Sequence, residues 1–105
     1  MSPKRLERVV LIDDGILENR LHQRMIDRSG LVDEVLCFAM AERALNHFRS
    51  PGALPAELIL LDINMPRMDG FELLETALAE FGAPFAATPV VFLTTSLNPR
   101  DRARA

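Results

Sequence analysis

The chain has 105 residues, which is enough for one domain, and 49% of them are hydrophobic, so a buried core is possible. Its formal charge of −3 gives no basic surface of the kind that binds nucleic acid or an anionic membrane. The one cysteine, Cys37, excludes an intrachain disulfide, and no apolar run has the length of a signal peptide or a membrane span. We therefore expect a soluble, cytoplasmic protein in which Cys37 is a small buried residue.

The chain alternates short apolar runs with segments of helical spacing. Each apolar run is rich in Val, Ile, Leu or Phe and lacks polar alternation, as do strands that are buried on both faces of a parallel sheet. In chain order, the predicted elements are a strand over Val9–Ile12, a helix over residues 17–29, a strand over Val35–Ala39, a helix from Ala41 to Phe48, a strand over Leu58–Leu61, a helix from about Phe71 to Phe81, a strand over Val90–Leu93 and the start of a helix at Asn98-Pro99.

Within each predicted helix, apolar residues recur at intervals of three or four and mark one face. Gly30 and Gly82 are the predicted stop signals of the first and third helices, and residues 82–89 are expected to form a surface connection. The apolar rows are Leu17, Leu21 and Met25 in the first helix, Ala41, Ala44, Leu45 and Phe48 in the second, and Phe71, Leu74, Leu78 and Phe81 in the third.

Strands that alternate with single helices predict an α/β fold with a parallel, doubly wound sheet. In such sheets, ligands bind at the carboxyl ends of the strands. Asp13 and Asp14 follow the first strand, Asp62 follows the third, and the hydroxyl residues of segment 94–96 follow the fourth. Each aspartate taken alone is an ordinary turn or cap residue. Their joint occurrence after two buried strands instead predicts a site on one rim of the sheet.

Crowded carboxylates repel one another, so at least one of them has a raised pKa unless a cation lies between them. Mg²⁺ suits a few carboxylates together with waters and phosphate oxygens. A carboxylate beside Mg²⁺ can attack phosphorus and form an aspartyl phosphate, while the metal offsets the charge that develops on the phosphoryl group. The acidic residues therefore predict a phosphoryl-transfer site.

The segment Leu60–Glu72 reads Leu-Leu-Asp-Ile-Asn-Met-Pro-Arg-Met-Asp-Gly-Phe-Glu and resembles the phosphorylation-loop motif of bacterial response regulator receiver domains. Residues 10–14 and 89–94 extend the resemblance, which runs from about residue 8 to the end of the chain. It implies a CheY-like, flavodoxin-like fold with strand order 2-1-3-4, Mg²⁺ as cofactor, and a sensor histidine kinase as the partner that donates the phosphoryl group.

The resemblance also implies roles for the acidic residues. Asp62 corresponds to the phosphoacceptor, Asp14 to the more direct metal ligand, and Asp13 to an acidic partner that acts largely through water. Asn64 stands where the family uses a backbone carbonyl as a further Mg²⁺ ligand. The implied metal set is therefore Asp13, Asp14, Asp62 and the carbonyl of Asn64.

Three further positions take their roles from the same resemblance. Thr94 matches the switch hydroxyl that moves to the phosphoryl oxygen, and Pro66 and Gly70 shape the loop. The family also has a lysine at the end of a fifth strand, whereas this sequence has no lysine after Lys4. We therefore treat residues 1–105 as a receiver domain that lacks its fifth strand and helix. A homodimer or another partner chain that completes the sheet is one way to cover the apolar fourth strand.

Two other functions stay open beside the phosphoacceptor switch, which is not an enzyme. A receiver-like interaction module that is never phosphorylated would explain the missing lysine. An aspartate-nucleophile phosphatase would use the same strand-end Asp62, although that class needs a second aspartate where Asn64 stands. His22 and His47 have no partner at metal-ligand spacing, so we expect both to be solvated surface residues.

Overall fold

A computed structural model of the chain describes residues 6–65 and 67–93. In chain order, its elements are β1 (Leu6–Ile12), α1 (Ile16–Ser29), β2 (Val32–Phe38), α2 (Ala41–Phe48), β3 (Ile59–Asp62), α3 (Gly70–Phe81), α4 (Ala83–Ala86) and β4 (Val90–Leu93). The four strands form one sheet in the order β2-β1-β3-β4, and every neighbouring pair is parallel. The predicted fold class and strand order are confirmed.

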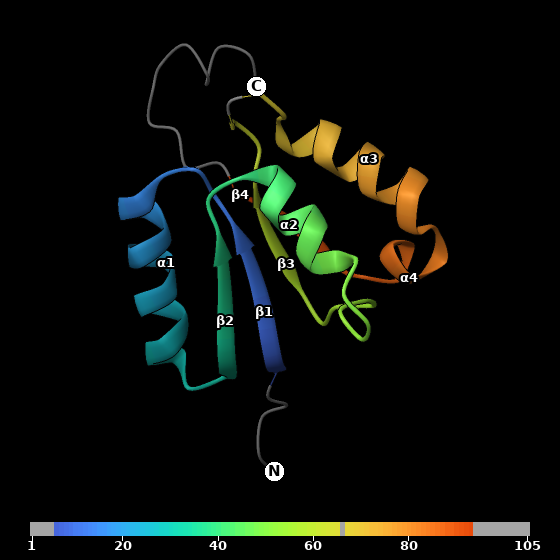
Figure 1. Cartoon of the computed structure of the whole chain (residues 1–105). Coiled ribbons are helices and arrows are strands. Elements are labelled where there is room, and N and C mark those ends of the chain that lie inside the picture. Colours follow the sequence, from blue (N-terminus) through green and yellow to red (C-terminus); the bar gives the residue numbers. More distant parts are fainter. Residues whose placement is uncertain (1–5, 66, 94–105) are drawn as a thin grey trace.

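Helices cover both faces of the sheet, with α1 on one side and α2 and α3 on the other (Figure 1). The main core lies on the α2 and α3 side, where Val10, Ile12, Ile59 and Leu61 of the strands meet apolar residues of both helices. In β1, residues 9–12 are at most 1% exposed. This burial on both faces explains why the strand has no polar alternation.

The register of the strands brings the ends of β1, β2 and β3 to the same edge. Ile12 pairs with Phe38 on one side and with Leu61 on the other. Asp13, the residue that follows β1, donates its backbone N–H to the carbonyl of Phe38 at 3.0 Å. Asp13 and Asp62 consequently leave neighbouring strands at the same level.

The first helix forms where it was predicted and ends at Gly30, which adopts the left-handed conformation with φ of 69°. Its apolar row does not face the sheet, because Leu17, Leu21 and Met25 are 65%, 51% and 67% exposed. The buried residue of α1 is instead Asn19, which is 8% exposed. The polar side of this helix therefore lies against the rest of the domain, and the apolar row faces outward.

The third helix begins at a capping box in which Asp69 accepts from the N–H of Glu72 at 2.8 Å and Glu72 accepts from the N–H of Asp69 at 3.1 Å. Its buried residues are Gly70, Leu73 and Ala77. The predicted row lies beside this buried face: Leu74 and Phe81 are partly buried, whereas Phe71 and Leu78 are 51% and 42% exposed.

One smaller prediction is wrong. Cys37 is exposed, since β2 is an outer strand of the described sheet, and its Sγ lies 3.6 Å from Oε1 of Gln23 on α1. Residues 82–89 are mostly exposed, as predicted of a surface connection, but they hold the short helix α4, in which Phe85 is 3% exposed and its ring lies 5.8 Å from the ring of Phe48. Among the described residues, no helix is long and apolar enough to cross a membrane.

Gly70 joins α3 to the loop that follows β3, and the contact is too close for a side chain. A Cβ at this position would lie 2.8 Å from the backbone oxygen of Asp62 and 3.1 Å from the Cα of Ile63. Both atoms belong to the backbone, so they cannot turn away as a side chain could. Gly70 therefore lets the start of α3 pack directly on the residue that ends β3.

We predict that Gly70→Ala lowers the free energy of unfolding by about 1–3 kcal/mol, the usual cost of overpacking a tight contact. Urea denaturation measures the effect. The exposed change Glu75→Ala on the same helix serves as the control and shifts stability by less than about 0.5 kcal/mol. Equal stability of the two variants would contradict the close packing of Gly70 on Asp62.

Candidate metal and phosphoryl-transfer site

The site at the carboxyl edge of the sheet consists of Asp13, Asp14 and Asp62. One carboxylate oxygen from each residue lies within 4.8 Å of the others. Asp13 and Asp62 are only 1% and 2% exposed, whereas Asp14 is exposed to solvent. The three predicted acidic residues therefore do meet, and the cluster is open on one side.

Backbone amides orient the two buried carboxylates. Asp13 accepts from the N–H of Gly15 at 2.8 Å through Oδ1, and Asp62 accepts from the N–H of Asn64 at 3.2 Å through Oδ1. In both cases the donor lies two residues after the aspartate, so each carboxylate caps its own turn. The turns that leave β1 and β3 thereby hold the two side chains in place.

The electrostatic cost of this arrangement is visible at Asp62. Burial, together with the charges of Asp13 and Asp14, raises the pKa of Asp62 from its ordinary value of 3.8 to about 6, against the lowering effect of the Asn64 amide. Burial likewise raises the pKa of Asp13, and Asp14 and Glu18 add to the effect. The cluster is thus a place where negative charge is unfavourable without a nearby cation.

The donor set fits an oxygen-preferring divalent cation such as Mg²⁺. All three side chains are carboxylates, which are the hard ligands that Mg²⁺ takes, usually together with several waters. Oδ2 of Asp13 is buried and has no hydrogen-bond partner within the described part of the chain. A cation held here would compensate that oxygen and the charges of the other two residues.

The remaining predicted site residues differ in what the structure says of them. Asn64 lies at the mouth of the site with its N–H on Asp62, and the role of its carbonyl oxygen as a metal ligand stays a prediction. Gly70 packs on Asp62 and donates its N–H to the carbonyl of Ile63 at 2.9 Å, and its role in shaping the loop stays a prediction. Pro66 and Thr94 lie outside the described residues.

Both histidines are less solvated than predicted. His22 is partly buried on α1, and its Nδ1 is fully buried without a hydrogen-bond partner in the ranges described. Its proximity lowers the pKa of Asp13, against the larger raising effect of burial. The ring of His47 lies 5.2 Å from that of Phe38, and burial, with the charge of Arg8, lowers the pKa of His47.

Sequence reasoning missed Asn19, which touches the site from behind. Its Nδ2 donates to the backbone carbonyl of Asp13 at 2.6 Å. The available signal was the pair Asn19 and His22, two polar residues three positions apart on the helix face opposite the apolar row. Polar residues on the exposed side of an amphipathic helix are so common that the pair by itself indicates no site.

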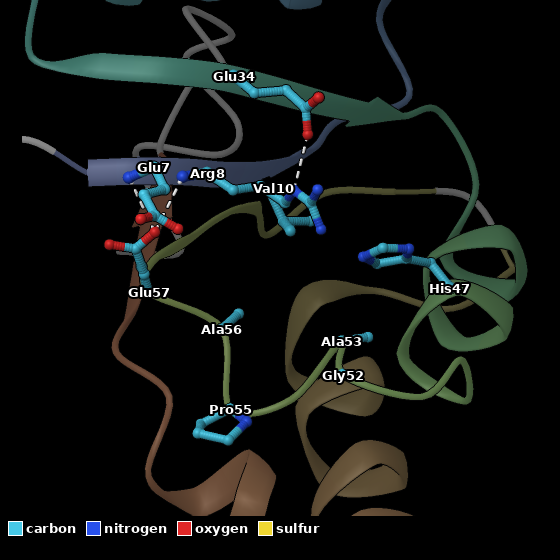
Figure 2. A pocket seen from close by; sticks show the side chains of 10 residues that line it. All are labelled: Glu7, Arg8, Val10, Glu34, His47, Gly52, Ala53, Pro55, Ala56 and Glu57. Carbon is cyan, nitrogen blue, oxygen red and sulfur yellow. Dashed lines mark hydrogen bonds and ion pairs between the residues drawn. The ribbon is translucent and has the colours of Figure 1, made fainter.

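A hollow of about 400 Å³ lies at the other end of the sheet, beside the start of β1 (Figure 2). Its charged residues are engaged with one another: Arg8 contacts Glu34 at 2.7 Å, and Glu57 accepts from the N–H groups of Glu7 and Arg8 at 2.9 Å each. These contacts tie the segment before β3 to β1. We assign the hollow a structural role, remote from the aspartates.

The raised pKa of Asp62 predicts how stability depends on pH. The folded state holds the proton more tightly than the unfolded state, so without divalent cation the free energy of unfolding falls as pH rises from about 4 to above about 6. Asp62→Asn removes this penalty and raises the free energy of unfolding by roughly 2–3 kcal/mol at about pH 7.5.

Urea denaturation at about pH 5 and about pH 7.5, with and without Mg²⁺, measures this effect. Mg²⁺ is expected to stabilise the wild type and to have a much smaller effect on Asp62→Asn. A wild type that is equally stable at both pH values without metal would contradict the electrostatic account of the site.

Several known proteins resemble this chain in sequence. It is 29% identical over 100 residues to the probable methanogenesis regulatory protein FilR2 of Methanothrix harundinacea, an alignment that covers 92% of this chain and 63% of that protein. It is 31% identical over 97 residues to the response regulator Rcp1 of Synechocystis, covering 89% and 65%. The chain therefore spans just under two thirds of the length of these curated relatives.

Solved structures resemble it as well. A two-component response regulator of Cytophaga hutchinsonii matches with a TM-score of 0.79 at 30% identity, covering 96% of this chain and 77% of that one. The chemotaxis protein CheY4 of Vibrio cholerae matches with a TM-score of 0.70 at 26% identity, covering 93% and 76%. The family model of the response regulator receiver domain matches residues 9–105. The chain therefore belongs to the response regulator receiver domains of two-component systems.

Proposed function

We propose that this receiver domain accepts a phosphoryl group on Asp62 from a sensor histidine kinase in the presence of Mg²⁺. The observation that carries the proposal is the meeting of three carboxylate oxygens within 4.8 Å at the end of the sheet. Receiver domains generally bind Mg²⁺ at such an acidic pocket and interact with histidine kinases. The residues proposed to hold the metal are Asp13, Asp14, Asp62 and the backbone carbonyl of Asn64.

In the proposed reaction, a carboxylate oxygen of Asp62 attacks the phosphorus of a phosphohistidine. The new P–O bond forms while the P–N bond breaks, and the imidazole of the donor leaves. Bound Mg²⁺ supplies positive charge that offsets the charge on the phosphoryl oxygens. The Asn64 amide orients Asp62, and a carboxylate oxygen of the buried Asp13 lies within 4.8 Å of one of Asp62.

We propose that phosphorylation then changes a protein-interaction surface through the hydroxyl of Thr94, as the resemblance implies. The chain acts as a phosphoacceptor switch and not as an enzyme, since Asn64 stands where a phosphatase of the aspartate-nucleophile class carries its second aspartate. We propose a cytoplasmic location for this chain, because the catalytic part of its kinase partner faces the cytoplasm.

The exposed apolar side chains of α1 offer a docking surface for the kinase. Ile16, Leu17, Leu21 and Met25 are 70%, 65%, 51% and 67% exposed. This exposed apolar surface begins at Ile16, two residues after Asp14, so a partner that covers it also reaches the acidic site. A helical surface that covers an exposed apolar row gains from the burial of both faces. We propose that the donor histidine is delivered from this side.

Intact mass after incubation with acetyl phosphate and Mg²⁺ tests the phosphoacceptor. The wild type is expected to gain one phosphoryl group, and Asp62→Asn none. Asp27→Asn makes the same chemical change at an exposed position of α1 and is expected to keep the gain. No gain in the wild type would overturn the proposal in favour of an interaction module, and repeated turnover of a phosphate ester would favour a phosphatase.

The role of α1 in docking has its own test. With a sensor kinase core that phosphorylates the wild type, Leu17→Glu is expected to slow phosphotransfer by about tenfold or more, which corresponds to a loss of about 1.4 kcal/mol. Phosphorylation by acetyl phosphate stays unchanged, because a small donor does not use the docking surface. Leu78→Glu, at an exposed position of α3, is the matched control. Equal slowing with both donors would contradict docking on α1.

A further inference from the structure

The side of α1 that faces the sheet carries polar groups behind the acidic site. Asn19 is 8% exposed, and its Oδ1 is buried without a hydrogen-bond partner in the described part of the chain. The Nδ1 of His22, one turn further along, is buried in the same way. His22 also lies close enough to Asp13 for its charge to act on that carboxyl. Two adjacent turns of the helix thus bury polar side-chain atoms, and Asn19 is the one that bonds to Asp13.

This choice of side chains is unfavourable for packing alone. A buried polar atom that lacks a partner destabilises the fold, because it gives up its hydrogen bonds to water and makes none in the protein, whereas an apolar side chain in the same place has no such cost. The same helix has apolar residues to offer, yet Leu17, Leu21 and Met25 face outward. The inward position of Asn19 therefore needs a reason other than core stability.

The reason is the contact that Asn19 makes with the end of β1. Its Nδ2 donates to the carbonyl oxygen of Asp13 at 2.6 Å. The N–H of Asp13 is bound to Phe38 at 3.0 Å, and its carboxylate Oδ1 accepts from Gly15 at 2.8 Å. Both backbone polar groups and one carboxylate oxygen of Asp13 are therefore held. The other carboxylate oxygen, Oδ2, is buried and has no hydrogen-bond partner in the described part of the chain.

We propose that Asn19 is a positioning residue of the metal site. By fixing the backbone of Asp13, it fixes where the Asp13 carboxylate lies relative to a divalent cation held by the cluster, although Asn19 is not itself a ligand. The inference rests on the proposed function for the identity of the cation. Asn19 would act through Asp13, as residues that hydrogen-bond to metal ligands commonly do.

The test measures metal affinity directly, with Mn²⁺ as the probe and electron paramagnetic resonance or calorimetry as the readout. Asn19→Leu keeps the size of the side chain and removes the donor, and it is expected to weaken Mn²⁺ binding on the order of tenfold. Asn46→Leu, the same change at an exposed position of α2, is expected to leave the affinity unchanged. If Asn19→Leu does not fold, Asn19→Ser replaces it, because a hydroxyl there ends short of the Asp13 carbonyl.

A merely structural role would lower the melting temperature and leave the affinity of the folded protein as it is. With acetyl phosphate as donor, the positioning role predicts a higher half-saturating Mg²⁺ concentration and a nearly unchanged maximal rate. Unaltered Mn²⁺ affinity in the folded Asn19 variant would overturn the inference. Wild type that binds Mn²⁺ but takes no phosphoryl group would overturn the proposed function alone, and wild type that binds no Mn²⁺ would overturn both.

Discussion

Mutual repulsion among the carboxylates of Asp13, Asp14 and Asp62 is the constraint on which the rest of the structure depends. The parallel register places Ile12 beside Leu61, so the fold forces the first and last of these residues together whether or not a cation is bound. Burial removes the solvent that would otherwise screen their charges. The raised pKa of Asp62 and the affinity we expect for a divalent cation are two results of the same geometry.

The rotation of α1 links this site to the surface of the domain. The polar side of the helix faces the sheet, where Asn19 bonds to Asp13, and the row that contains Leu17 and Leu21 faces outward. One helix thus serves two proposed roles, because its polar side steadies a metal ligand and its apolar row offers a surface beside the acceptor. An amphipathic helix placed for core stability alone would have the opposite orientation.

Much of this was predictable because it depends on local pattern and on one rule of topology. Continuous apolar runs mark buried parallel strands, and the ends of such strands meet at one edge, so Asp13 and Asp62 could be brought together from the sequence. The rotation of α1 was not predictable, since its strongest pattern is the apolar row and the bond from Asn19 goes to a backbone atom that no pattern marks. The exposure of Cys37 depends on which strand lies at the edge, which is a property of the whole sheet.

The most direct test of the account is the titration of the Asp62 carboxyl by carbon NMR, without and with Mg²⁺. We predict a pKa of about 6 for Asp62 in the metal-free protein. Saturating Mg²⁺ is predicted to lower that pKa to or below the ordinary value of 3.8, because the cation favours the charged form. An ordinary pKa without metal, or a raised pKa that Mg²⁺ does not change, would contradict the claim that these aspartates form one cation-dependent site.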